Sequence, residues 1–212
     1  MKLEKLEILN LSYLDRIDSS YYKKSKLQGN KNNKINEALN VDVLAKINFK
    51  NLKVLDLSKN EKIDISSLAK VNFNELIELN LRGILIHYLI ILKEFKLPKL
   101  EKLFLGVNRI YDINELENIY LDNLLQLDLG SCGINDISFL ENVKFEKLKL
   151  LNLGWNNISD ITVLEEVNFL QLENLYLSKN IINDITALEK VRFRNLKELN
   201  LSFMPCASAQ ST

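Results

Sequence analysis

The chain has 212 residues, of which 47% are hydrophobic, and its 28 Lys and Arg residues balance its 28 Asp and Glu residues. This hydrophobic fraction supports a folded core, whereas a chain without net charge is a poor candidate for nucleic-acid binding, which needs a clustered basic surface. Two cysteines do not form a disulfide framework, and we find neither a signal peptide nor a run long enough to span a membrane, so we expect a cytoplasmic protein without membrane contacts.

The first predicted element is a short strand at residues 6–11, and a lysine-rich segment follows it. Residues 19–35 contain five lysines and no acidic residue, so we expect residues 15–35 to form an exposed, mobile insertion loop. A basic patch for an acidic partner is the alternative. The separation of 46 residues between Leu6 and Leu52 fits one unit with a 22-residue insertion, or two units that have lost one strand.

From Leu52 onward, leucine recurs every 24 residues, and a fixed period of this length is typical of a solenoid. The recurring residues are Leu52, Leu76, Leu100, Leu124, Leu148, Leu172 and Leu196. Each unit opens with alternating residues such as Leu55 and Leu57, which predicts a short strand. Eight positions after the first leucine stands an asparagine that we expect to bond the backbone of neighbouring coils. These asparagines are Asn60, Asn108, Asn156 and Asn180.

Four residues after the asparagine position, an aspartate precedes an I-x-x-L step. The aspartates are Asp64, Asp112, Asp136, Asp160 and Asp184. Each suits the N-cap of a short helical turn. Stacked about 5 Å apart, as neighbouring strands are, the same carboxylates could also hold calcium. Because each carboxylate has a use within its own turn, we expect no metal and no cofactor.

The unit at residues 76–99 breaks the pattern. Ile84 and Tyr88 replace the asparagine and the aspartate, and residues 82–92 are almost all apolar, which predicts either extra core or an exposed docking patch. This unit also holds the only histidine, His87, while Cys132 takes the asparagine position two units later. At the usual strand spacing these two side chains lie roughly 10 Å apart, too far for proton transfer. We therefore expect Cys132 to be a small buried residue and the protein to have no catalytic pair.

The chain begins and ends within a unit, and we recognise no cap at either end. Residues 196–201 form the last predicted strand, and we expect residues 204–212 to be a disordered tail. Two hypotheses follow. Either these repeats are a piece of a longer array, or the last strand pairs with another chain and produces self-association.

The pattern L-x-x-L-x-L-x-x-N-x-I-x-D-I-x-x-L resembles the leucine-rich-repeat family, and its I-x-D-I-x-x-L step is similar to the internalin and SDS22-like subclass. The resemblance implies an α/β solenoid over residues 1–203. It would be a horseshoe with a parallel concave sheet of about seven to eight short strands and a convex side of 3₁₀ or irregular turns. Its units are longer than is usual for the subclass, because each carries an extra V-x-F segment. The resemblance also implies a protein partner on the concave face, without indicating which one.

The residues between the inward leucines of each strand are expected to point outward, because strand side chains alternate. The candidate partner-binding residues on this face are Phe104, Val107, Leu150, Asn152, Trp155, Tyr176 and Phe203. Trp155 is the only tryptophan, and Trp and Tyr are enriched at interface hot spots. We therefore predict a non-enzymatic protein–protein interaction scaffold. The alternatives are a structural repeat array, or a fragment in which the repeats target a fused enzyme or effector domain.

Overall fold

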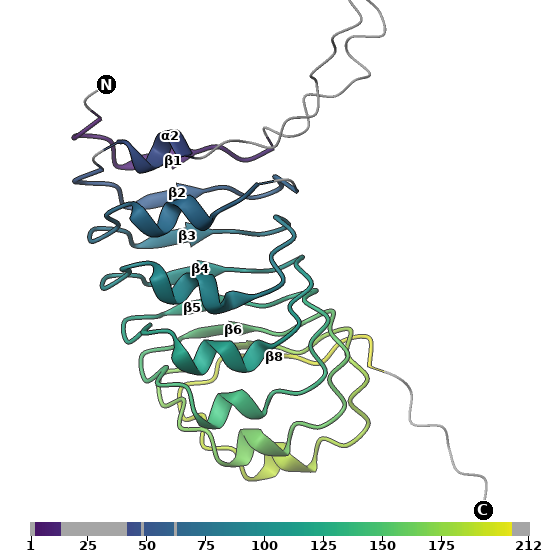
Figure 1. Ribbon diagram of the computed structural model, residues 1–212. Helices are drawn as coiled ribbons and strands as arrows, with labels where there is room; N and C mark the ends of the chain where they lie inside the picture. The colour runs from purple at the N-terminus through teal and green to yellow at the C-terminus, as the bar shows by residue number, and fades with distance from the viewer. Residues whose placement is uncertain (1–2, 14–41, 48, 62, 205–212) are drawn as a thin grey trace, which may run out of the picture.

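The computed structural model describes residues 3–13, 42–47, 49–61 and 63–204 of the chain. In this part of the chain, eight short strands form one parallel sheet whose spatial order is the order of the sequence (Figure 1). The strands are β1 (Ile8–Asn10), β2 (Val54–Asp56), β3 (Glu78–Asn80), β4 (Lys102–Phe104), β5 (Gln126–Asp128), β6 (Leu150–Asn152), β7 (Asn174–Tyr176) and β8 (Glu198–Asn200). The predicted parallel sheet of the α/β solenoid is thereby confirmed.

The 24-residue period sets the register of the sheet. Leu79 pairs with Leu103, and Leu151 pairs with Leu175, so equivalent residues of successive units lie side by side. The exception is the first pair, in which Ile8 lies opposite Val54 across 46 residues of sequence. The predicted insertion at residues 15–35 falls among residues 14–41, and the predicted tail falls almost wholly among residues 205–212. Both segments lie outside the described residues.

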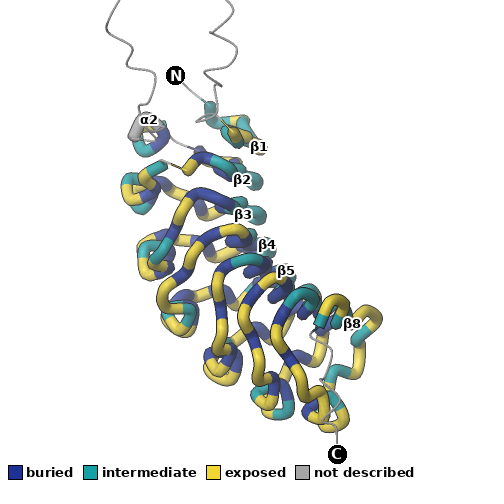
Figure 2. Tube along the Cα trace, turned by 90° about the vertical axis from the view of Figure 1, so that its right-hand side faces the viewer, coloured by how far each residue is buried: buried dark blue, intermediate teal, exposed yellow. Residues whose placement is uncertain are grey.

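Short helical turns form the second layer of the solenoid (Figure 2). They are α2 (Asp42–Ala45), η2 (Ser66–Lys70), η3 (Leu89–Glu94), η4 (Ile113–Asn118), η5 (Ser138–Glu141), η6 (Thr162–Glu165) and η7 (Thr186–Glu189), of which all but α2 are 3₁₀ helices. Figure 2 shows the strands on one side of the stack and the turns on the other. Among the described residues, no helix combines the length and the apolarity needed to cross a bilayer.

The predicted capping aspartates lie one residue too early in most coils. Asp112 is the N-cap of η4, but Ile161 is the N-cap of η6, and isoleucine stands at the same position of η2, η5 and η7. The reason is local hydrogen bonding. The carboxylate of Asp160 accepts the backbone N–H of Thr162 at 2.8 Å, which closes an Asx turn just ahead of the helix.

The core lies between the two layers. Leucines such as Leu151 and Leu153 point inward and are fully buried in the inner coils, whereas Leu199 of the last strand is 37% exposed. Buried phenylalanines such as Phe73 and Phe169 close the core at the far end of the units. Burying one such side chain stabilises the fold by roughly 1.5–3 kcal/mol, and every coil repeats the same set. The core therefore continues along the whole sheet.

Candidate protein-interaction face

The outward side chains of the eight strands form a surface that we call the sheet face. In β6, Leu150 and Asn152 point outward and are half-buried, whereas Leu151 between them is fully buried. Phe104 and Tyr176 occupy the same outward position as Asn152, in β4 and β7. The structure therefore places all four of these predicted site residues on the sheet face.

The chain turns sharply at the position that follows the strand by three residues. The residues there form the rim column, which comprises Tyr13, Lys59, Gly83, Val107, Ser131, Trp155, Lys179 and Phe203. All eight have a φ between 58° and 63°, the left-handed region that strongly favours glycine, and only Gly83 occupies it without strain. Stacking of the coils favours this conformation, because the N–H of every rim residue except Phe203, in the last coil, bonds a carbonyl of the next coil, as Trp155 does to Ser178 at 2.8 Å.

The rim column carries the most exposed aromatic side chains of the predicted site. Trp155 is 65% exposed and Phe203 is 72% exposed, while Val107 is also exposed in the middle of the column. Lys179 lies between the two aromatic residues, one coil from each. Its ammonium is 5.3 Å from the centroid of the Trp155 ring and 3.5 Å from that of Phe203, both within the range of cation–π attraction. The three side chains therefore form one cluster.

Tyr176 is held in place by the neighbouring coil. Its hydroxyl donates a hydrogen bond to the Glu198 carboxylate at 2.9 Å, and the side-chain amide of Asn174 donates to the same oxygen at 3.0 Å. The hydrogen bond to Glu198 is the main cause of a raised pKa of Tyr176, with burial and the charge of Glu198 adding to it. The phenol thus stays protonated and presents a fixed, half-buried ring.

Asn152 has less freedom to bind a partner than its position suggests. Its carbonyl oxygen accepts the N–H of Gly154, and its amide donates to Asp128 at 2.7 Å. Asp128 is buried, and its other oxygen lies 2.6 Å from the guanidinium of Arg82, two coils away. A Cβ at Gly106 would stand 2.8 Å from that oxygen, so glycine is required between them. This network was missed at the sequence level.

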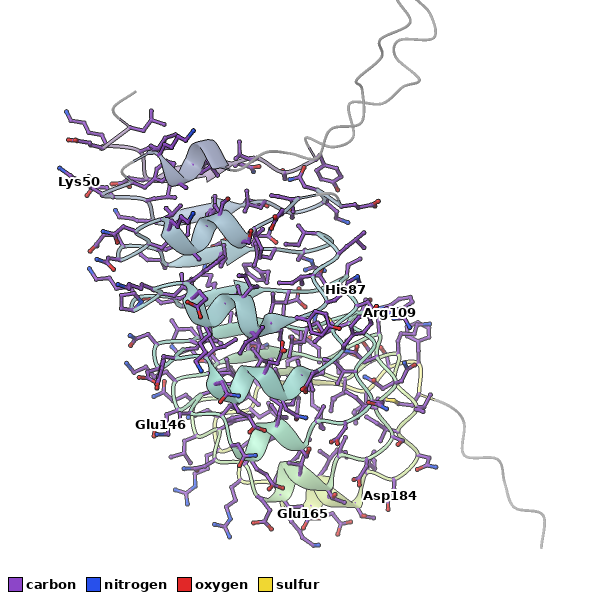
Figure 3. The ribbon with its side chains drawn as sticks, in the orientation of Figure 1. Lys50, His87, Arg109, Glu146, Glu165 and Asp184 are labelled. Carbon is purple, nitrogen blue, oxygen red and sulfur yellow. The ribbon has the colours of Figure 1, made fainter. Side chains whose placement is uncertain are left out.

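The sequence left open whether the apolar stretch in the unit at residues 76–99 forms extra core or an exposed patch, and the structure contains both. Ile84 and Ile86 are buried, whereas Leu85, Tyr88 and Ile90 are exposed. Figure 3 shows His87 and Arg109 on the edge of the solenoid where the strands end. Leu85 and Tyr88 stand close to His87 in the sequence, whereas Ile90 lies in η3.

Aromatic rings stack on this edge. The His87 ring lies parallel to Tyr111 with a centroid distance of 4.7 Å, and Tyr88 meets Tyr111 edge-on at 5.4 Å. The Nδ1 atom of His87 is 2.8 Å from the carbonyl oxygen of Arg109, which fixes the ring. Contacts within the protein therefore hold the rings of His87, Tyr88 and Tyr111 in place.

Cys132 and His87, the two residues considered for a catalytic pair, lie in different environments. Cys132 is fully buried, and burial raises the pKa of its thiol to about 12, so it stays protonated. Its sulfur contacts the carbonyl of Leu105 at 3.3 Å, and His87 lies apart at the edge. No group of three or more His, Cys, Asp or Glu side chains in this part of the chain could hold a metal ion.

The parallel sheet, the repeated 3₁₀ turns and the buried asparagines together define a leucine-rich-repeat solenoid. No protein-family model and no curated protein matches the sequence, but solved structures do. The chain is similar to an internalin, InlF, from Listeria monocytogenes, with 26% identity and a TM-score of 0.53 over 77% of this chain and 50% of that one. The chain therefore has the leucine-rich-repeat fold.

Two further structures support the same fold. Internalin C2 from Listeria monocytogenes is 24% identical, with a TM-score of 0.55 and coverage of 71% of each chain. A leucine-rich-repeat protein from Leptospira interrogans is 23% identical, with a TM-score of 0.54 over 76% of this chain and 38% of that one. The present chain thus spans half the length of InlF and about two fifths of the Leptospira protein. Repeat scaffolds of this kind generally bind other proteins.

Proposed function

We propose that this chain is a non-enzymatic scaffold that binds a protein partner on the sheet face, with the contact centred on Trp155, Tyr176 and Phe203. Leu150 adds apolar area beside them, and Phe104 and Val107 extend the surface toward β4. These residues supply what interface centres are rich in, namely aromatic rings in defined orientations.

The proposal depends mainly on one observation, which is that two aromatic residues, Trp155 and Phe203, are exposed at backbone positions that are unfavourable in free energy for any residue but glycine. Each stands in the left-handed region, which costs a non-glycine residue roughly 1–2 kcal/mol, and each leaves most of its ring in solvent. Glycine, as at Gly83, would relieve the strain at the same turn. The whole rim column shares the left-handed turn, but these two positions carry large rings that the fold leaves mostly in solvent, and contact with a partner is the better explanation for that exposure.

The test is affinity capture from cells of the source organism, with the wild-type chain and a Trp155→Gly variant as baits. Glycine suits the backbone at this position, so the variant should fold with a thermal unfolding midpoint close to that of the wild type. The matched control is Tyr120→Ala, since Tyr120 is an aromatic residue outside the sheet face that is even more exposed than Trp155.

We expect a protein that both the wild type and Tyr120→Ala retain and Trp155→Gly loses. If Trp155→Gly retained every captured protein, the result would contradict binding on the sheet face. A marked drop in the unfolding midpoint of Trp155→Gly would instead assign Trp155 a structural role.

A second proposal is that the repeats target another domain of a longer protein. The solved structures of InlF and the Leptospira protein support it, because both extend well beyond the part that matches this chain. Sequencing the surrounding reading frame tests it directly. A cytoplasmic location, and the absence of nucleic-acid and membrane partners, remain predictions.

A further inference from the structure

The charges on the sheet face are not distributed evenly between its two sides. On the side where the strands begin, the lysines are matched by glutamates one coil away. These pairs are Lys53–Glu7 at 3.1 Å, Lys102–Glu78 at 3.2 Å, Lys149–Glu173 at 3.9 Å and Lys197–Glu173 at 2.6 Å. Each of these four lysines therefore already has a carboxylate partner within the array, with Glu173 shared by two of them.

Lys179, on the rim column, is different. Its contacts are with the rings of Trp155 and Phe203, and no carboxylate of the described residues lies within 4 Å of its ammonium. The Glu198 carboxylate of the next strand has other partners, because it accepts hydrogen bonds from Tyr176 and Asn174. The cluster thus presents an ammonium without a counter-charge between two exposed aromatic rings.

The spacing of the cluster defines what fits it. Trp155 and Phe203 are two coils apart, roughly 10 Å at the usual strand spacing, a distance that about three residues of extended chain span. Because the side chains of an extended segment alternate, the residues that face the rim column are every second one, about 7 Å apart. Apolar side chains at positions i and i+4 would then reach the two rings, with the side chain of residue i+2 opposite Lys179. A carboxylate there would form a charge-assisted hydrogen bond with the ammonium, which is stronger than a neutral one.

We propose that the partner segment recognised by this cluster is acidic, with an Asp or Glu side chain held by Lys179 and flanked by apolar side chains on Trp155 and Phe203. The inference rests on the proposed function and specifies its partner. A protein segment is favoured over nucleic acid, because the backbone of a nucleic acid needs several clustered cations and the other rim positions around Lys179 are Ser131, Trp155 and Phe203.

The test is selection from a random dodecapeptide display library with the wild type, Lys179→Glu and Lys197→Glu as baits. Lys197 is the matched control, since it is an exposed lysine of the same coil region whose charge is already paired with Glu173. The wild type and Lys197→Glu should enrich peptides with Asp or Glu between apolar residues. Lys179→Glu should lose these peptides and enrich Lys or Arg at that position instead.

A selected peptide is then titrated against each bait. Replacing its Asp or Glu by Asn or Gln should weaken binding to the wild type by roughly tenfold or more, as for other hydrogen bonds to charged groups, and added salt should weaken it further. Equal binding of the acidic and amide peptides, or the same peptides from all three baits, would overturn the acidic specificity and leave the proposed function standing. Preferential binding of oligo(dT) would also overturn it. A Trp155→Gly bait that selects the same peptides as the wild type would count against both the acidic specificity and the proposed function.

Discussion

At the residue scale, the left-handed turn of the rim column carries a glycine in one coil and an exposed aromatic residue in others. The left-handed backbone of the rim column is favoured by the stacking of coils, and Gly83 adopts it without strain. Trp155 and Phe203 adopt it at a cost and remain exposed. This contrast separates residues that build the solenoid from residues available to a partner, a distinction that periodicity alone could not make.

The buried asparagines belong to the first group. The side-chain amide of Asn156 donates to the carbonyl oxygens of Leu129 and Leu153 at 2.9 Å each, and its own oxygen accepts the N–H groups of Cys132 and Ile134. One side chain thus satisfies backbone groups of two coils, as the sequence predicted.

Replacing Asn156 with alanine should lower the free energy of unfolding by roughly 3 kcal/mol or more, because each buried polar group left without a partner costs about 1–3 kcal/mol. Asn157→Ala is the matched control, since Asn157 is an exposed neighbour in the same turn. Its unfolding free energy should stay within about 0.5 kcal/mol of the wild type. Equal effects in urea denaturation would contradict the role assigned to Asn156.

At the scale of the element, the Asx turns make the coil ends sensitive to acid. Asp64, Asp160 and Asp184 have lowered pKa values, caused first by the backbone N–H two residues on and second by the hydroxyl side chain of that residue. The folded-state pKa therefore lies below the unfolded value of about 3.9. The ionised carboxylates stabilise the fold above that value, and this contribution is lost as the pH falls through the folded-state pKa.

Thermal unfolding should therefore show a midpoint that falls as the pH is lowered from about 5 to about 2. A triple variant with Asp64→Asn, Asp160→Asn and Asp184→Asn keeps an acceptor oxygen at each turn but does not titrate there. Its midpoint should fall less than that of the wild type over the same range. Parallel curves for the two proteins would show that these carboxylates are not responsible for the acid sensitivity.

At the scale of the whole molecule, the fold was predictable because one pattern decides every coil. The leucine alternation predicted which face of each strand is buried, and the period predicted the register between Leu79 and Leu103. The Arg82–Asp128 pair was not predictable, because it spans 46 residues and depends on a glycine in the intervening coil. The shifted position of the aspartates was missed because an Asx turn and an N-cap have the same sequence signature.

The candidate site was predictable in part for the same reason. Strand alternation placed Leu150, Asn152 and Tyr176 on the sheet face, but periodicity could not show that Asn152 is held by its neighbours or that Lys179 lies against the two aromatic rings. Those facts depend on side-chain conformations across coils. The identity of a partner is not encoded in the repeat at all, since the repeat specifies only the scaffold.

The most direct test of the central claim uses the only tryptophan of the chain as a reporter. Labelling with 5-fluorotryptophan gives a protein with one ¹⁹F resonance, from Trp155, which lies at the centre of the proposed contact. Titration with the captured partner should shift or broaden this resonance and reach saturation at the stoichiometry of the complex. A resonance that stays unchanged while the partner is demonstrably bound would contradict binding on the sheet face.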